Sequence, residues 1–140
     1  MKKITVYLII LMFSISPAWS EVVSGVFKTN PSEETGGYLH IEFGACPDNK
    51  ELSCGIIKTA IKKDGTTNNS YENLGKMMVW NMQDAGSGKF KGGKIWDPSE
   101  NNEDGSKKIY NSKMTLTGTT LRVDGCILFF CKGQDWEKVN

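Results

Sequence analysis

An excess of charge of one sign is missing from this sequence. Its 140 residues carry 17 Lys and Arg against 16 Asp and Glu. Lys2 and Lys3 are the only charged residues among the first twenty, and without them the balance is 15 against 16, a net charge of −1. Binding to polyanions requires a basic surface, so a neutral chain with mixed charges is poorly suited to nucleic acid or to an anionic membrane. We therefore expect no nucleic-acid partner.

An apolar run long enough to span a membrane is also missing. The first run, residues 6–13, follows the two lysines and precedes Ala18-Trp19-Ser20, a small-x-small cleavage site. It is shorter than the roughly 20 residues that a membrane-spanning helix needs. These features together are typical of a secretory signal peptide, with an uncleaved anchor as the alternative. We predict a signal peptide over residues 1–20, cleavage near Ser20, and a periplasmic or secreted protein that does not span the membrane.

Metal-binding patterns are scarce. His40 is the only histidine, and the cysteine spacings differ from the short gaps of zinc modules. Residues 100–105 have the alternating oxygen groups of a calcium loop, but Asn111 stands where a bidentate Glu is required. A solvated polar loop is the simpler interpretation and a weak calcium site is the alternative. We expect neither a metal nor a cofactor.

Four cysteines are present, an even number that in an oxidising compartment predicts two disulfides. Three pairings are open. Cys46 and Cys54 bracket a turn-rich segment, and Cys126 and Cys131 are closer still. Because short loops close at a low entropic cost, we expect each cysteine to pair with its neighbour in the sequence.

No pattern of apolar residues at helical spacing continues for more than two turns. After residue 21 the chain instead alternates polar and apolar residues in short runs separated by Gly, Asn, Asp and Ser. About eight strands close a small barrel, and connections too short for crossover helices favour antiparallel neighbours. Residues 21–140 are therefore predicted to form one all-β domain, an antiparallel up-and-down β-barrel of about eight strands. The expected strands are 22–29, 38–43, 54–62, 76–82, 90–96, 108–116, 120–127 and 133–139.

Local signals refine this barrel. Gly92-Gly93 predicts a bend or bulge, and Pro98 is expected to end its strand because it has no N–H group. Segments 66–74 and 97–107 are expected to be polar surface loops. For segment 66–74, a short helical turn or a cover over a barrel mouth is the alternative. Phe27 and Trp136, near the two ends of the chain, should pack together if the first and last strands pair.

Several short blocks resemble a known family. The pattern resembles the bacterial exported family catalogued as domain of unknown function 2147 over essentially the whole mature chain. The resemblance implies a small exported barrel, calycin-like (as in lipocalins) or streptavidin-like, and so a fold and a compartment rather than a reaction. Phe27 departs from the Trp of the family's Gly-x-Trp opening. The blocks are Gly25-Val26-Phe27, Cys54-Gly55, residues 92–98, Tyr110, residues 121–131 and residues 134–139.

Soft and aromatic side chains suggest a ligand cavity. Met78, Trp80 and Met82 alternate along one strand and should share one face. Because Met adapts to varied apolar ligands, this face can line a barrel cavity, although a barrel filled by its own side chains is the alternative. The candidate lining residues are Ile57, Met78, Trp80, Met82, Trp96 and Tyr110.

The second pair of cysteines encloses four large apolar residues. They either plug one end of the barrel or stand exposed as a contact for a partner protein or the membrane surface. The plug is favoured because contiguous exposed apolar surface is uncommon. The exposed alternative predicts an interaction module of the cell envelope. The four residues are Ile127, Leu128, Phe129 and Phe130.

Two polar pairs are candidates for catalysis. His40 with Glu42, and Asp135 with Glu137, lie two residues apart and so share a strand face. A base with an orienting carboxylate, or two carboxylates, can be catalytic. No nucleophile motif accompanies either pair, and a polar solvent face accounts for both. We therefore expect a non-enzymatic protein that binds a small apolar or amphipathic ligand.

Overall fold

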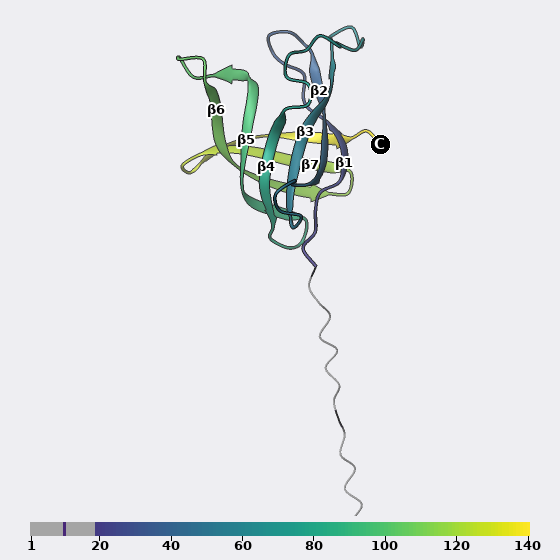
Figure 1. Cartoon of the computed structure of the whole chain (residues 1–140), viewed down its shortest axis with the longest axis vertical. Coiled ribbons are helices and arrows are strands. Elements are labelled where there is room, and N and C mark those ends of the chain that lie inside the picture. Colours follow the sequence, from purple (N-terminus) through teal and green to yellow (C-terminus); the bar gives the residue numbers. More distant parts are fainter. Residues whose placement is uncertain (1–9, 11–18) are drawn as a thin grey trace, which may run out of the picture.

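Eight antiparallel strands follow one another around a closed barrel in this computed structural model, which describes residue 10 and residues 19–140. Each strand pairs with its neighbours in the sequence, which confirms the predicted all-β, up-and-down barrel (Figure 1). The predicted signal peptide lies outside the described residues except for Ile10, Trp19 and Ser20. The strands are β1 (Gly25–Lys28), β2 (Tyr38–Ala45), β3 (Leu52–Ile61), β4 (Met77–Asp84), β5 (Lys89–Asn101), β6 (Lys107–Thr117), β7 (Thr120–Ile127) and β8 (Phe130–Lys138).

A short seam between β1 and β8 closes the barrel. Phe27 faces Lys138 and Lys28 faces Glu137, whereas β7 and β8 pair along their whole length. The C-terminus strengthens the seam, because the Val139 N–H donates to the Val26 carbonyl oxygen at 2.8 Å. Within the described residues, the first half of β8 therefore pairs with β7 alone.

Aromatic rings form the centre of the core. The ring centre of Phe43 lies 5.8 Å from that of Phe27 and 6.3 Å from that of Trp136. Phe43 therefore joins the two aromatic residues that were expected to pack together. Each such buried side chain contributes roughly 1.5–3 kcal/mol of hydrophobic stabilisation. Other fully buried side chains are Ile41, Ile57, Val79, Met82, Met114 and Leu121.

The glycine pair in β5 forms the predicted bulge. The register between β5 and β6 shifts between Phe90 and Gly93, and Gly92 has a φ of 76°. A Cβ on Gly93 would overlap the Met82 side chain and the Trp80 carbonyl oxygen. The two glycines thus have different tasks, since one takes a left-handed backbone and the other permits close packing.

The expected end of β5 at Pro98 is wrong, because the strand continues to Asn101. The register with β6 shifts again between Trp96 and Asn101, so Pro98 lies in an irregular stretch where the ladder does not need its N–H. Much of the expected loop 97–107 is therefore a long hairpin, and a turn at Asn102 to Ser106 connects its strands.

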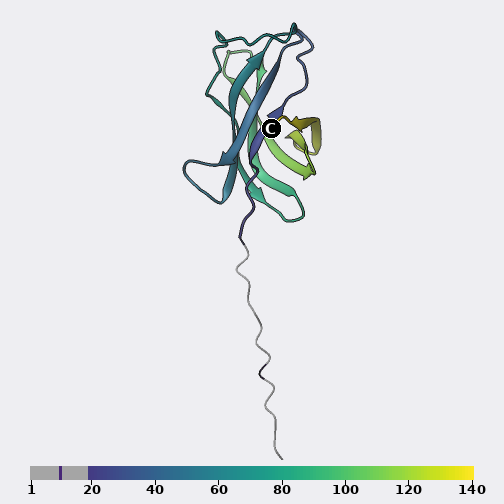
Figure 2. The same cartoon turned by 90° about the vertical axis from the view of Figure 1, so that its right-hand side faces the viewer.

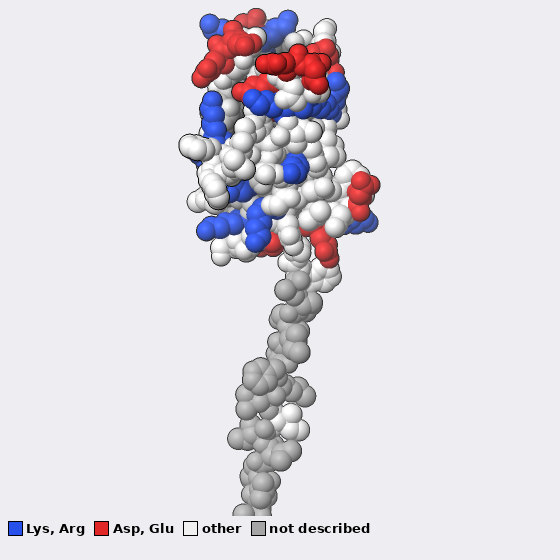
Figure 3. Space-filling view, turned by 90° about the vertical axis from the view of Figure 1, so that its left-hand side faces the viewer, with Lys and Arg blue, Asp and Glu red and all other residues white. Residues whose placement is uncertain are grey.

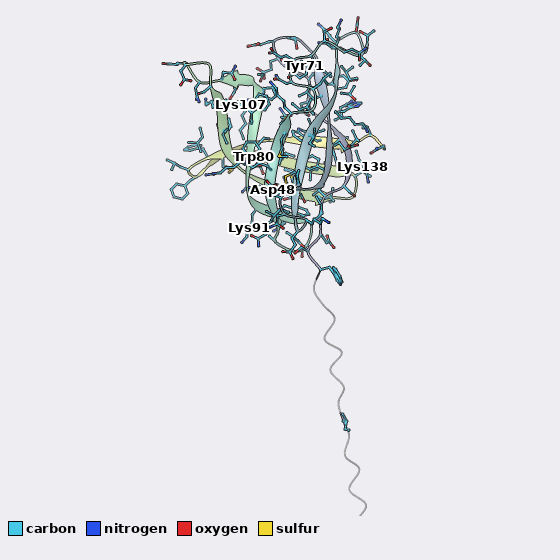
Figure 4. All side chains as sticks on the ribbon, in the orientation of Figure 1. Asp48, Tyr71, Trp80, Lys91, Lys107 and Lys138 are labelled. Carbon is cyan, nitrogen blue, oxygen red and sulfur yellow. A yellow bond between two sulfur atoms is a disulfide. The ribbon has the colours of Figure 1, made fainter. Side chains whose placement is uncertain are left out.

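The loop between β3 and β4 packs against the barrel. Tyr71 and Leu74 contact the hydrophobic core, and Asn73 is buried. Asn73 accepts a hydrogen bond from Lys76 Nζ at 2.8 Å. Figures 1 and 2 show this loop at the upper end of the molecule, where Figure 4 labels Tyr71. Part of the segment expected to be a plain surface loop therefore covers apolar surface.

Two disulfides form, and each joins two cysteines that follow one another in the order of cysteines along the chain. Cys46 bonds to Cys54 between β2 and β3, and Cys126 bonds to Cys131 across β7 and β8. Disulfides of this kind are typical of proteins outside the reducing cytoplasm. Among residue 10 and residues 19–140, no helix has the length and hydropathy needed to cross a bilayer.

Candidate functional site

A cavity of about 390 Å³ opens beside the β7–β8 hairpin. Ligand pockets commonly have volumes of about 300–1,000 Å³. A second, shallower hollow of about 240 Å³ beside the Cys46–Cys54 bridge falls below that range. The larger cavity is lined by Met78, Ile95, Asp97, Glu100, Tyr110, Val123, Gly125, Ile127, Phe130, Cys131, Lys132, Gly133, Gln134 and Trp136.

Strand alternation brings most of these residues together. On β7, Val123 and Gly125 line the cavity, and on β8 their register partners Gln134 and Lys132 line it too. Leu121, two residues before Val123, is fully buried and does not line the cavity. Along β7 the barrel interior thus changes from packed side chains to open space.

Gly125 helps to create this space. A Cβ at this position would lie 3.4 Å from Ile95 Cγ2 and 3.5 Å from Tyr110 Cβ, which is ordinary van der Waals contact. A methyl group is therefore accommodated, whereas the further atoms of a larger side chain would occupy cavity volume. Gly125 does not have a positive φ, so its backbone tolerates other residues.

The floor of the cavity is apolar and is continuous with the core. Ile95, Val123 and Trp136 are buried members of the core cluster. The Trp136 indole N–H donates to Gln134 Oε1 at 2.9 Å, and the Asn30 N–H donates to the same oxygen at 3.3 Å. Since its carbonyl oxygen is engaged, Gln134 retains its NH₂ group as a donor for a ligand.

The mouth of the cavity is charged. The Tyr110 hydroxyl donates to Glu100 Oε2 at 2.6 Å. Partial burial, followed by this hydrogen bond, raises the pKa of Tyr110, so the hydroxyl stays neutral near pH 7. Lys132 makes no ion pair with any described residue, and Asp97 accepts a hydrogen bond from the Ser99 N–H at 2.9 Å. The mouth therefore presents two carboxylates and one unpaired ammonium group.

The structure places two of the six expected lining residues, Met78 and Tyr110, at the cavity. Of the other four, Ile57 and Met82 are fully buried in the core, Trp80 packs against the core from a half-buried position, and Trp96 is buried away from the lining.

Asn81 explains why the expected alternation along β4 fails. Asn81 has a φ of 59°. Ser53 faces Met82 and Gly55 faces Val79, so β4 contains one more residue than β3 between these two pairs. This bulge puts Val79 and Met82 into the interior together and leaves Trp80 half-buried.

Trp96 has an unusual environment. It is only 4% exposed, and the Lys107 ammonium lies 4.2 Å from its ring centre, within the range of a cation–π contact. Its Nε1 has no hydrogen-bond partner among the described residues.

Most of the cavity residues were not anticipated. The alternation of Val123, Gly125 and Ile127 was visible in the sequence and could have identified this face of β7. Asp97 and Glu100 had no such signal, because their position depends on the irregular second half of β5.

The enclosed apolar residues 127–130 do not plug the barrel. Ile127 faces Phe130 as the last pair of the β7–β8 ladder, so only two residues connect the strands and the hairpin projects from the barrel (Figure 1). Their exposed fractions are 55% for Ile127, 87% for Leu128, 100% for Phe129 and 87% for Phe130.

The two polar pairs considered for catalysis have other partners. Glu42 forms an exposed ion pair with Lys58 at 2.8 Å. His40 is half-buried, and this burial, followed by the nearby Lys28 charge, lowers its pKa. Neither residue lines the cavity.

The side chains of the other pair, Asp135 and Glu137, both contact residues of β7. Asp135 lies 3.4 Å from Arg122 Nη1, and Glu137 accepts a hydrogen bond from Thr120 at 2.8 Å. Within the described part of the chain, no three His, Cys, Asp or Glu side chains gather as metal ligands.

A family model matches residues 25–138, from the first residue of β1 to the last of β8, and its description is "Uncharacterized protein conserved in bacteria (DUF2147)". The chain belongs to this family. The DUF2147 match spans all eight strands, both disulfides and every residue that lines the cavity. Neither the curated proteins nor the solved structures contain a match to the chain.

Proposed function

We propose that this DUF2147 protein is exported and binds one small amphipathic molecule in the cavity beside the β7–β8 hairpin. One observation carries the proposal: the cavity joins an apolar floor to a charged mouth. A purely apolar ligand would leave the polar groups of the mouth dehydrated and unpaired, which is unfavourable. An amphipathic ligand matches both regions.

The lining suggests how such a ligand lies. Its apolar part packs on Ile95, Val123 and Trp136, where burial contributes roughly 25 cal/mol per Å² of apolar surface. Its polar part lies at the mouth, with anionic groups toward Lys132 and donor or cationic groups toward Glu100. The volume of about 390 Å³ limits the bound portion to a small molecule or a short chain.

A cavity-filling variant tests the proposal. Gly125→Val places a strand-compatible side chain in the cavity without demanding a special backbone. Titration with the neutral fluorescent probe N-phenyl-1-naphthylamine should show saturable binding to the wild type. We expect Gly125→Val to weaken that binding at least about tenfold, since it removes buried apolar contact.

A matched control separates this effect from a general cost of replacing a strand glycine. Gly44→Val makes the same change in β2, where a Cβ meets no atom within 4 Å. It should bind the probe as the wild type does. Equal binding by wild type and Gly125→Val would contradict the cavity as the binding site.

The exposed tip favours a second candidate function. Residues 127–130 are accessible on a projecting hairpin, as an interaction module of the cell envelope requires. The two functions are compatible, because Leu128 and Phe129 do not line the cavity.

A further inference from the structure

The tip of the β7–β8 hairpin, residues 127–130, is a convex apolar projection. All four side chains are more than half exposed, and Phe129 is fully exposed. The Cys126–Cys131 disulfide lies directly behind the tip and ties the two strands together. The apolar residues are thus held away from the barrel on a braced support.

The backbone of the tip does not suit its residues. Leu128 has a φ of 52°, a left-handed conformation that two-residue turns normally assign to Gly, Asn or Asp. Phe129 does not have a positive φ, so a turn selected for stability alone would carry Gly at the first of the two positions. Leu128 is present despite this conformational cost, and Phe129 beside it is fully exposed, which points to a task for the exposed side chains.

The shape of the tip favours lipid over a protein as its partner. A stable protein interface covers about 800 Å² on each partner, which a two-residue turn and its flanking pair do not supply. A lipid interface instead surrounds a convex projection from every side. Figure 3 shows the side on which the hairpin projects in Figure 1, and the middle of that face is largely free of charged side chains.

The tip is also continuous with the cavity. Ile127 and Phe130 belong to both, and Lys132, the next residue on that face of β8, is at the mouth. When the tip lies among acyl chains, Lys132 is placed toward the head groups. The cavity mouth then faces the lipid.

We propose that the hairpin tip inserts into the interfacial region of a phospholipid bilayer and turns the cavity mouth toward the lipid. Insertion depends only on the tip. The consequence that an amphipathic ligand passes directly between bilayer and cavity rests on the proposed function. Because the tip is uncharged and the chain is nearly neutral, apolar burial drives the binding.

Vesicle binding by the full mature protein tests this proposal. The probe is a vesicle of phosphatidylcholine, which carries no net charge. The variant Leu128→Gly/Phe129→Ser replaces the tip by residues that suit its backbone, with Gly at the position of positive φ, and leaves the cavity lining intact. We expect its vesicle partition coefficient to fall at least about tenfold while its melting temperature is unchanged or higher. Wild-type binding should change less than about twofold between low and high salt.

A control variant removes an exposed apolar side chain elsewhere. Val139 is 43% exposed and follows Lys138, which lies on the opposite side of the molecule from the hairpin (Figure 4). Val139→Ser should bind vesicles as the wild type does. Phe129→Ser, which keeps Leu128, provides a second tip variant with the same expected loss if the double variant fails to fold.

Three results would overturn the proposal. They are wild-type protein that does not sediment with vesicles, tip variants that bind as tightly as wild type, and capture of an envelope protein by the tip without vesicle binding.

Gly125→Val separates this proposal from the proposed function. It should keep vesicle binding even though it loses the cavity probe, and loss of vesicle binding in this variant would contradict a role confined to the tip.

Discussion

Single residues with unusual backbones determine where the cavity and the tip lie. Asn81, at a φ of 59°, interrupts the alternation of β4 and moves Met82 into the core. Leu128, at a φ of 52°, allows the turn that exposes Phe129. Period-two patterns cannot foresee such residues, since each changes the face of the side chains that follow. For this reason Trp80 is half-buried beside the core, whereas Ile57, Met82 and Trp96 belong to the part of the barrel that side chains fill.

The carboxylate of Asp84, the last residue of β4, predicts a pH effect. The N–H groups of Glu21 and Gly86 donate to Asp84 at 2.9 and 2.8 Å and lower its pKa. A lowered folded pKa stabilises the protein above the unfolded value of about 3.9, and this contribution is lost as the pH falls through the folded pKa. We expect Asp84→Asn to melt below the wild type at pH 7 and to match it near pH 2.

Thermal unfolding from pH 7 to pH 2 measures the difference. Glu21 is the first residue of the predicted mature chain, so the donor there becomes a charged α-amino group and the effect should be larger in that chain. A gap between wild type and Asp84→Asn that stays constant over the whole pH range would show that the hydrogen bonds to the carboxylate do not cause it.

At the scale of elements, the sequence was informative about strands and less so about their irregularities. Residues 120–127 were predicted with the bounds that β7 has, because the run alternates regularly between clear turns. β5 was predicted to stop at residue 96 but continues to Asn101, because a bulge tolerates Pro98. The two carboxylates of the cavity mouth depend on that extension. The mouth was therefore harder to foresee than the barrel.

The β1–β8 seam makes the C-terminus important for stability. Deleting residues 138–140 removes three hydrogen bonds, from Lys138 N–H to Thr119, from Val139 N–H to Val26, and from Val26 N–H to Asn140. At roughly 0.5–1.5 kcal/mol each, their loss should lower the free energy of unfolding by about 1.5–4.5 kcal/mol. Urea unfolding measures this change.

Hydrogen exchange provides a local readout of the same deletion. Because β1 is the shortest strand and keeps only the pair Lys28 and Glu137 across the seam, its amides should exchange faster, while β6 and β7 stay protected. Val139→Ala keeps the backbone and serves as the control. An unchanged free energy of unfolding in the deletion variant would show that the seam does not contribute to closure.

The whole molecule combines a filled core, an open cavity and a projecting apolar tip. Aromatic and aliphatic residues fill one part of the barrel, and the cavity lies between this core and the tip. Charge is nearly balanced, so neither site depends on long-range attraction. Composition indicated this neutrality, and the alternation of polar and apolar residues between turns indicated the barrel fold. Which end of the barrel stays open depends on side-chain volumes that meet only in the closed barrel.

Native mass spectrometry can show directly whether the cavity holds a ligand. The mature wild type and Gly125→Val would be purified from their own envelope fraction without reduction and measured before and after organic extraction. We predict that the wild type carries a small adduct that extraction releases, and that Gly125→Val does not. Both polypeptides should lie four hydrogens below their reduced masses, because each contains two disulfides. A bare wild-type mass, or an adduct that Gly125→Val retains, would contradict the assignment of the cavity as a ligand site.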